Sequence, residues 1–114
     1  MINEYPKHAS IQNYCGVALF QSGQNELAIH HIKKAITIAP NYSEAHFNLA
    51  VALESADQVQ PAILSYLTAL KLNPKLVQAY NNLGIIYYQK GEFNKSIAMY
   101  RQATKVTPTT TSVI

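Results

Sequence analysis

The side chains that could carry out chemistry in this chain are few, and they do not form a catalytic pattern. His30 and His31 are adjacent, so a helix would point them about 100° apart, and Glu26 lies one helical turn before His30. His8 and His46 have no carboxylate or cysteine at metal-ligand spacing. We interpret Glu26 and His30 as a surface pair, expect no metal and no cofactor, and predict that the protein is not an enzyme.

Cysteine chemistry and secretion are also disfavoured by the sequence. Cys15 is the only cysteine among 114 residues, so no disulfide can form within the chain. We expect its thiol to be buried as a small hydrophobic group. The first ten residues lack the basic-then-apolar pattern of a signal peptide, and no apolar run approaches ~18 residues. These features predict a cytoplasmic protein without a membrane segment.

An internal repeat organises the chain. Segments 9–42, 43–76 and 77–110 are each 34 residues long and align without a gap. Equivalent positions hold the same kinds of residue, among them Gly16/Ala50/Gly84, Ala28/Ala62/Ser96, Ala35/Ala69/Ala103 and Pro40/Pro74/Pro108. A fixed period of this length is typical of a solenoid of stacked helix pairs, and the small residues would let paired helices approach closely. Residues 1–8 then form an N-terminal extension and residues 111–114 a C-terminal tail.

Each repeat contains two helical patterns separated by a turn. In the third repeat, apolar and aromatic residues mark one face over 77–90, and a second such pattern covers 93–106. Gly91 between them can adopt positive φ without a Cβ clash. Asp57 replaces this glycine in the second repeat, and we expect it to adopt the left-handed conformation at some cost. The sequence therefore predicts an all-α fold of six antiparallel helices.

These repeats resemble the tetratricopeptide repeat family. The third repeat matches the family pattern of aromatic, Leu-Gly, small and proline residues at Tyr80, Leu83, Gly84, Tyr87, Gly91, Phe93, Tyr100, Ala103 and Pro108. The first repeat diverges most, with Gln12 where the pattern favours an aromatic residue. The resemblance spans residues 9–110 and implies a right-handed α-solenoid whose first helices line a concave groove.

A second stripe on the first helix of each repeat is the candidate partner-binding groove. Steps of four and three residues put each of three trios on one helical face. The trios are Asn13, Val17 and Phe20, then Phe47, Val51 and Glu54, then Asn81, Ile85 and Tyr88. Tyr14, Asn48 and Asn82 would edge this face, and the two asparagines could hold the main chain of an extended peptide. Val17, Val51 and Ile85 fit an inter-repeat core equally well.

The groove pattern predicts a protein partner, bound as an extended peptide or as a short helix. Tetratricopeptide cochaperones hold the acidic C-terminus of heat-shock chaperones with two asparagines, two lysines and an arginine. The corresponding places here are Asn13, Val17, Asn48, Gln78 and Asn82, so we predict no such carboxylate clamp. The Asn81-Asn82 pair is similar to repeats of O-linked N-acetylglucosamine transferases and bacterial scaffold proteins. An accessory module of a larger enzyme, such as a glycosyltransferase, is therefore an alternative to a scaffold.

The charge pattern disfavours nucleic acid as a partner. The formal net charge is only +3. The basic residues of the third repeat lie at a helix end or on its second helix, off the groove face: Lys90, Lys95, Arg101 and Lys105. Binding to single-stranded nucleic acid would need cations interleaved with aromatic residues on the groove itself.

The last helix of the third repeat is a candidate self-association surface. No capping helix is apparent after this repeat, and solenoid ends usually need a polar cap. We expect four apolar side chains to be partly exposed there: Met99, Tyr100, Ala103 and Val106. Such a patch predicts a homo-oligomer, a longer array or a docking site for another protein, and a self-assembling repeat protein is the remaining alternative function.

Overall fold

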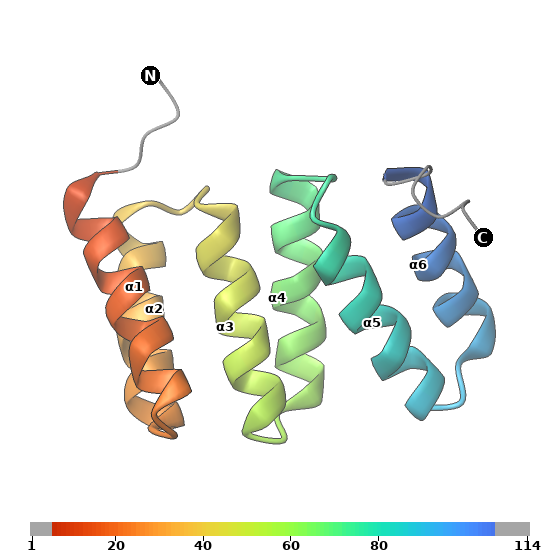
Figure 1. Cartoon of the computed structure of the whole chain (residues 1–114), viewed down its shortest axis with the longest axis horizontal. Helices are drawn as coiled ribbons and strands as arrows, with labels where there is room; N and C mark the ends of the chain where they lie inside the picture. The colour runs from red at the N-terminus through yellow and green to blue at the C-terminus, as the bar shows by residue number, and fades with distance from the viewer. Residues whose placement is uncertain (1–5, 107–114) are drawn as a thin grey trace.

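The computed structural model describes residues 6–106, which form six α-helices and no strand (Figure 1). The helices are α1 (Lys7–Gln21), α2 (Asn25–Ile38), α3 (Ser43–Ser55), α4 (Val59–Leu72), α5 (Val77–Gln89) and α6 (Phe93–Val106). They pack as three antiparallel pairs, α1 with α2, α3 with α4 and α5 with α6, and the pairs follow one another along the long axis. The expected all-α solenoid is therefore confirmed. Pro108 and the predicted tail, residues 111–114, lie outside the described residues.

The turn within each helix pair closes on one residue with positive φ. These residues are Gly23 at 88°, Asp57 at 64° and Gly91 at 80°. The next backbone N–H then donates back into the last turn of the preceding helix, as from Gln58 to the Leu53 carbonyl oxygen at 2.9 Å. This is the Schellman arrangement, which satisfies carbonyl groups at a helix end. The expected left-handed conformation of Asp57 is confirmed.

Small residues allow close contact within each pair. A Cβ atom added to Gly16 would lie 2.4 Å from Cγ1 of Ile32, and one added to Gly84 would lie 2.7 Å from Cζ of Tyr100. Ser96 on α6 donates from Oγ to the Gly84 carbonyl oxygen at 2.8 Å. The facing positions Ala28 and Ala62 are likewise buried. The packing role expected for these small residues is therefore confirmed.

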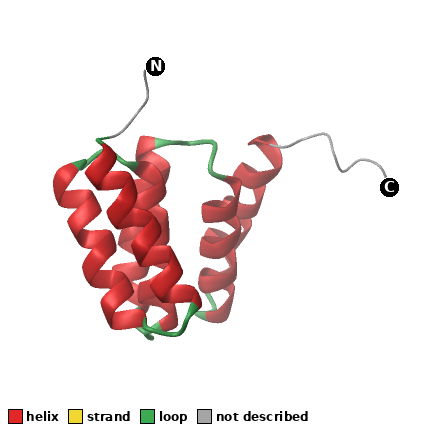
Figure 2. Cartoon of the chain, turned by 60° about the vertical axis from the view of Figure 1, so that its left-hand side comes forward, coloured by secondary structure: helices red, strands yellow, loops and turns green. Residues whose placement is uncertain are grey.

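The core continues from one pair to the next because α2 packs against α3 and α4 packs against α5. Its largest fully buried side chains include Ile32, Tyr66 and Leu83, one from each repeat. Figure 2 shows the α5–α6 pair beside the other four helices, joined to them by the loop between α4 and α5. No helix among residues 6–106 combines the length and the apolar character needed to cross a bilayer.

The prediction of a buried thiol at Cys15 is wrong, because this residue is exposed. Its equivalents Leu49 and Leu83 are buried where the preceding helix pair packs against α3 and α5. Within the described part of the chain no helix pair precedes α1, so the outer face of α1 is exposed. Ile11 and Tyr14 on this helix are exposed as well.

Candidate partner-binding groove

The inner helices α1, α3 and α5 carry two adjoining pockets that share Val51. The first, called the apolar pocket here, has a volume of about 170 Å³ and is lined by Val17, Phe20, Gln21, Ile32, Phe47, Asn48 and Val51. The second, called the polar pocket, has a volume of about 310 Å³ and is lined by Val51, Glu54, Ser55, Tyr66, Asn82 and Ile85. Together they follow the junctions between successive repeats along the predicted groove.

The apolar pocket lies between α1 and α3, and residues three or four positions apart on each helix line it. Val17 and Phe20 project from α1, and Phe47 and Val51 project from α3, at steps that keep each pair on one face. The Phe47 ring meets the Tyr66 ring edge-on, with centroids 5.7 Å apart, which fixes the wall between this pocket and the next repeat. The pocket can take one aliphatic or aromatic side chain.

The polar pocket is organised by a buried tyrosine. The Tyr66 hydroxyl donates to Oε1 of Glu54 at 2.7 Å and accepts a hydrogen bond from Nδ2 of Asn82 at 3.1 Å. Burial raises the pKa of Tyr66 far above its usual value, and the hydrogen bond to the Glu54 carboxylate raises it further. The phenol therefore stays a proton donor, and it holds the Glu54 carboxylate at the pocket wall.

A second network joins the first two repeats. Asn13 is 0% exposed, and its Nδ2 donates to the Tyr42 hydroxyl at 3.3 Å. Its Oδ1 accepts a hydrogen bond from Nδ2 of Asn48 at 3.0 Å. Asn13 thus links α1 to α3 and presents no surface to a partner, unlike the groove position predicted for it.

The predicted groove residues divide into three groups. Eight line the two pockets: Val17, Phe20, Phe47, Asn48, Val51, Glu54, Asn82 and Ile85. Tyr14, Asn81 and Tyr88 are exposed but line neither pocket. The Tyr88 ring contacts Phe93 instead, with centroids 5.5 Å apart. Asn13 is buried.

Sequence reasoning missed the contribution of the second helices to the groove. Ile32 from α2 and Tyr66 from α4 line the pockets, although they occupy a core position of the repeat. The signal for Tyr66 was available, because a tyrosine at a buried position needs a partner for its hydroxyl. Glu54, near the C-terminal end of the adjacent helix α3, provides that partner.

A third pocket, of about 370 Å³, extends the groove toward the N-terminal ends of α3 and α5. It is lined by Glu44, Phe47, Asn48, Lys75, Leu76, Val77 and Gln78. It shares Phe47 and Asn48 with the apolar pocket. Its opposite charges, Glu44 and Lys75, give it no clear preference for one sign of ligand.

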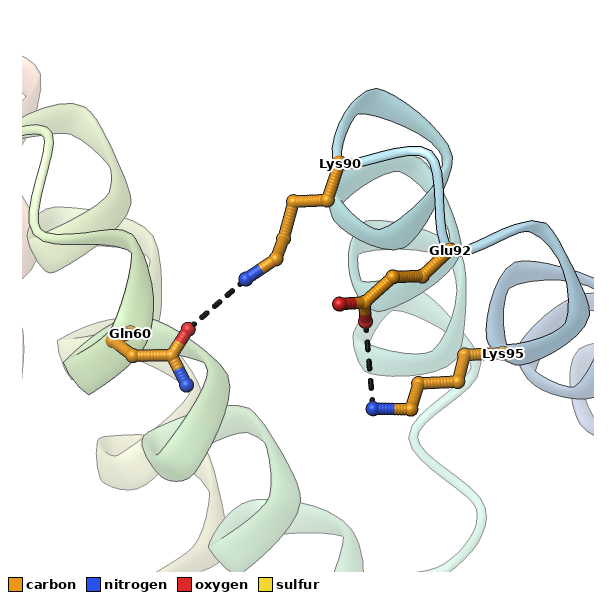
Figure 3. A network of polar contacts seen from close by, with 4 residues as sticks. All are labelled: Gln60, Lys90, Glu92 and Lys95. Carbon is orange, nitrogen blue, oxygen red and sulfur yellow. Dashed lines mark hydrogen bonds and ion pairs between the residues drawn. The ribbon is translucent and has the colours of Figure 1, made fainter.

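The basic residues of the third repeat do not line the two central pockets, and no lysine or arginine is among the described residues that do. Lys90, past the end of α5, donates from Nζ to Oε1 of Gln60 on α4 at 3.1 Å (Figure 3). Lys95 on α6 lies 3.4 Å from the Glu92 carboxylate. Among the described residues, the two central pockets therefore lack the cations that a phosphate backbone or an acidic peptide would require.

The histidines make local contacts. Nδ1 of His31 lies 2.7 Å from Oε1 of Gln12. The His30 ring meets the His31 ring edge-on, and within residues 6–106 no ion pair joins His30 to Glu26, so the expected surface pair is absent. No group of three or more histidine, cysteine and acidic residues able to hold a metal occurs in this part of the chain.

The exposed apolar residues of α6 agree only in part with the predicted self-association set. Ala103 is buried inside the α5–α6 pair, as its equivalents Ala35 and Ala69 are in theirs. Met99 packs against the core, and Val106 is half-buried. Of the four residues predicted to be partly exposed, only Ala103 is not. Tyr100 joins two other exposed residues on one helical face, which we call the end face: Phe93, Ile97 and Tyr100.

A stack of antiparallel helix pairs with pockets along its inner helices defines the protein as an α-solenoid. A family model described as TPR repeat matches residues 16–57 and 58–91, and one described as Tetratricopeptide repeat matches residues 77–109. The chain belongs to the tetratricopeptide repeat family. No curated protein sequence matches it.

Several solved structures share this fold. The first TPR of Spaghetti (RPAP3), bound to the HSP90 peptide SRMEEVD, is 19% identical with a TM-score of 0.86, over 97% of this chain and 88% of that one. The Arabidopsis OM64 TPR domain is 20% identical with a TM-score of 0.85, over 92% of this chain and 87% of that one. MamA is 23% identical with a TM-score of 0.85, and the match covers 88% of this chain but 58% of MamA. At these identities the likeness shows the fold alone.

Proposed function

We propose that this protein is a non-catalytic interaction module that binds a peptide segment of a protein partner across the apolar and polar pockets. The observation that carries this proposal is the continuity of the two pockets, which meet at Val51 on the middle inner helix. A concave, largely apolar surface with a few fixed polar groups is typical of ligand sites. An extended peptide can place successive side chains into adjoining pockets of this kind.

The hydrogen bonds within the groove define what its asparagines offer a peptide. Asn48 and Asn82 each use Nδ2 in a contact between repeats. Their amide oxygens accept no hydrogen bond from the described residues, so they are available to N–H groups of a bound main chain. The peptide would therefore be held through its donors.

The solved TPR structure of RPAP3 with the HSP90 peptide supports a peptide as the class of ligand for this fold. We do not propose the HSP90 peptide itself as the ligand, because its C-terminal part is acidic and no lysine or arginine is among the described residues that line the two pockets. An accessory module of a larger enzyme would use the same groove.

A selection from a random peptide library displayed on phage, performed on the full chain, tests the proposal. Val51→Arg would fill the junction of the two pockets, and we expect it to weaken selected peptides at least tenfold. Leu64→Arg places the same side chain at an exposed position of α4 outside both pockets and should bind like the wild type. Circular dichroism would show that both variants remain folded. Equal binding by Val51→Arg, or the absence of any selected peptide, would refute the groove function.

We propose a second interaction surface, the end face, whose occupant would be a second copy of this chain. Ile97 is 46% exposed, whereas its equivalent in the second repeat, Ile63, is 5% exposed because α5 covers it. Tyr100 is likewise exposed, whereas its equivalent in the second repeat, Tyr66, is fully buried. The exposed outer face of α1 carries Ile11, Tyr14 and Cys15 at positions that pack against the preceding pair in the other repeats. Stacking one copy on another would bury both faces head to tail.

Sedimentation velocity over a range of concentrations tests this second surface. We expect wild-type species larger than the 12.7 kDa monomer at tens of micromolar, and a shift to monomer for Ile97→Asp. Thr37→Asp, on the exposed face of α2, is the matched control. A wild-type protein that stays monomeric throughout would contradict self-association.

A further inference from the structure

We infer that the partner segment carries a lysine or arginine that pairs with Glu54, close in sequence to an apolar residue that enters the apolar pocket. The inference rests on the proposed peptide-binding function and specifies the chemistry of its ligand. It depends on the charge, the hydrogen bonds and the shape of the polar pocket.

Of the described residues that line the two pockets, Glu54 is the only charged one. Its Oε1 accepts the hydrogen bond from Tyr66, which donates as a neutral phenol, so the negative charge is not neutralised. Within residues 6–106 the ion pair is Lys95 with Glu92, and no cation lies at Glu54. A carboxylate has about four acceptor positions, so most of the hydrogen-bonding capacity of Glu54 is not used by Tyr66.

The other walls of the polar pocket suit a long cationic side chain. Val51 and Ile85 are apolar and can pack against a methylene stem, while Ser55 and the amide oxygen of Asn82 add polar acceptors. An ammonium group has three donors and a guanidinium group five, and neither has an acceptor. The volume of about 310 Å³ admits such a side chain together with water.

The apolar pocket determines what accompanies the cation. Because Val51 lines both pockets, side chains bound in them must come from positions near each other in the ligand. Phe20 and Phe47 provide aromatic walls that favour an aliphatic or aromatic group. An acidic residue at the Glu54 position would meet a like charge with no compensating cation, which disfavours acidic segments.

Glu54→Gln isolates the charge from the structural role of this residue. The glutamine amide oxygen can still accept the Tyr66 hydrogen bond, so the contact with α4 is retained. Glu26→Gln makes the same change in net charge on the first turn of α2, at an exposed position outside both pockets. Comparing the two variants separates a local effect at the groove from a general effect of charge.

The experiment uses peptides selected from the phage library on the full wild-type chain, made synthetically with a fluorescent label and titrated by fluorescence anisotropy. We expect lysine or arginine next to an apolar residue to be enriched among them. Glu54→Gln should weaken binding about tenfold, the size expected for loss of a charge-assisted hydrogen bond. Glu26→Gln should leave the affinity unchanged. Replacing the basic residue of the peptide by methionine should remove the difference between the wild type and Glu54→Gln.

Two results would overturn the inference. If selected peptides bind at Val51 but show no basic enrichment, or bind Glu54→Gln as tightly as the wild type, the ligand is not cationic and the proposed groove function remains. If the library yields no binding peptide, both the inference and the groove function fail.

Discussion

The two interfaces between successive repeats use one equivalent amide in different ways. At the first interface, Nδ2 of Asn48 donates to Asn13, which is fully buried. At the second, Nδ2 of the equivalent Asn82 donates to Tyr66, which in turn donates to Glu54 at the polar pocket. The first network is neutral and its centre, Asn13, is fully buried, whereas the second ends on a carboxylate that lines the polar pocket. The repeat fixes where the amide lies, and the preceding repeat determines whether its hydrogen-bond network is neutral or ends on a charge.

Part of the physical cause of this difference lies in one core position of the second helices. The first repeat has Ile32 there, which offers no hydroxyl, so Asn48 bonds to Asn13 on α1. The second repeat has Tyr66, whose hydroxyl both receives the amide hydrogen and requires an acceptor of its own. Two differences between the repeats, Tyr66 in place of Ile32 and Glu54 in place of Phe20, thus bring a charge into the groove.

The largest effect on stability is expected when the hydrogen bonds at the first interface are removed. Asn13→Ala removes one partner each from Tyr42 and Asn48 in a buried place, so we expect the free energy of unfolding to fall by about 2–3 kcal/mol. Asn81→Ala changes the same residue at the equivalent exposed position and should cost less than about 0.5 kcal/mol. Urea denaturation followed by circular dichroism measures both. Similar losses in the two variants would mean that Asn13 is not part of a buried network.

A second comparison concerns packing within the first and third helix pairs. Gly16→Ala would bring Cβ to 2.4 Å from the buried Ile32 and 3.1 Å from the Ala28 carbonyl oxygen, so we expect a loss of about 1–3 kcal/mol. Gly84→Ala meets Tyr100, which is partly exposed and can move, so its loss should be below about 1 kcal/mol. Thermal melts of both variants provide the test. Ala50 already occupies this position opposite Tyr66, and equal melting of Gly16→Ala and the wild type would show that the α1–α2 contact is looser than described.

The smallest effect is expected at the second interface at high pH. The folded protein raises the pKa of Tyr66 above its usual value near 10.0, so its contribution to stability is fully present below pH 10 and is lost as the pH rises. Above pH 10 the wild type should lose up to about 1.4 kcal/mol per pH unit more than Tyr66→Phe, which has no hydroxyl to ionise. Urea denaturation of both proteins at pH 9 and pH 11 gives this difference. Parallel pH dependence would place Tyr66 in a less buried environment.

Much of the fold could be predicted from the sequence because local signals and the repeat agree. The turn residues Gly23, Asp57 and Gly91 lie where the period places them, and all three have positive φ. The small residues face one another within the pairs as their positions indicate. Each of these features is determined by the type of a single residue, and the equivalent residues of the other repeats support the same prediction.

The site was less predictable because it depends on contacts between repeats. Helical spacing correctly put Asn13 on the same face of α1 as Val17. Its burial depends on Tyr42, at the end of the first repeat, and on Asn48 from the second repeat. The exposure of Cys15 likewise depends on which helices lie beside α1, and not on the residue itself. Tyr66 could be recognised only by asking where a buried hydroxyl finds its partners.

The most direct test of the central claim is a methyl-resolved NMR titration of the full chain with a selected peptide. If the ligand occupies the two adjoining pockets, the methyl signals of Val17, Val51 and Ile85 should shift with peptide concentration. Those of Leu27 and Leu64, exposed on the second helices and outside both pockets, should stay in place. Shifts confined to Leu27, Leu64 or Ile97, with Val51 unchanged, would contradict a binding groove on the inner helices.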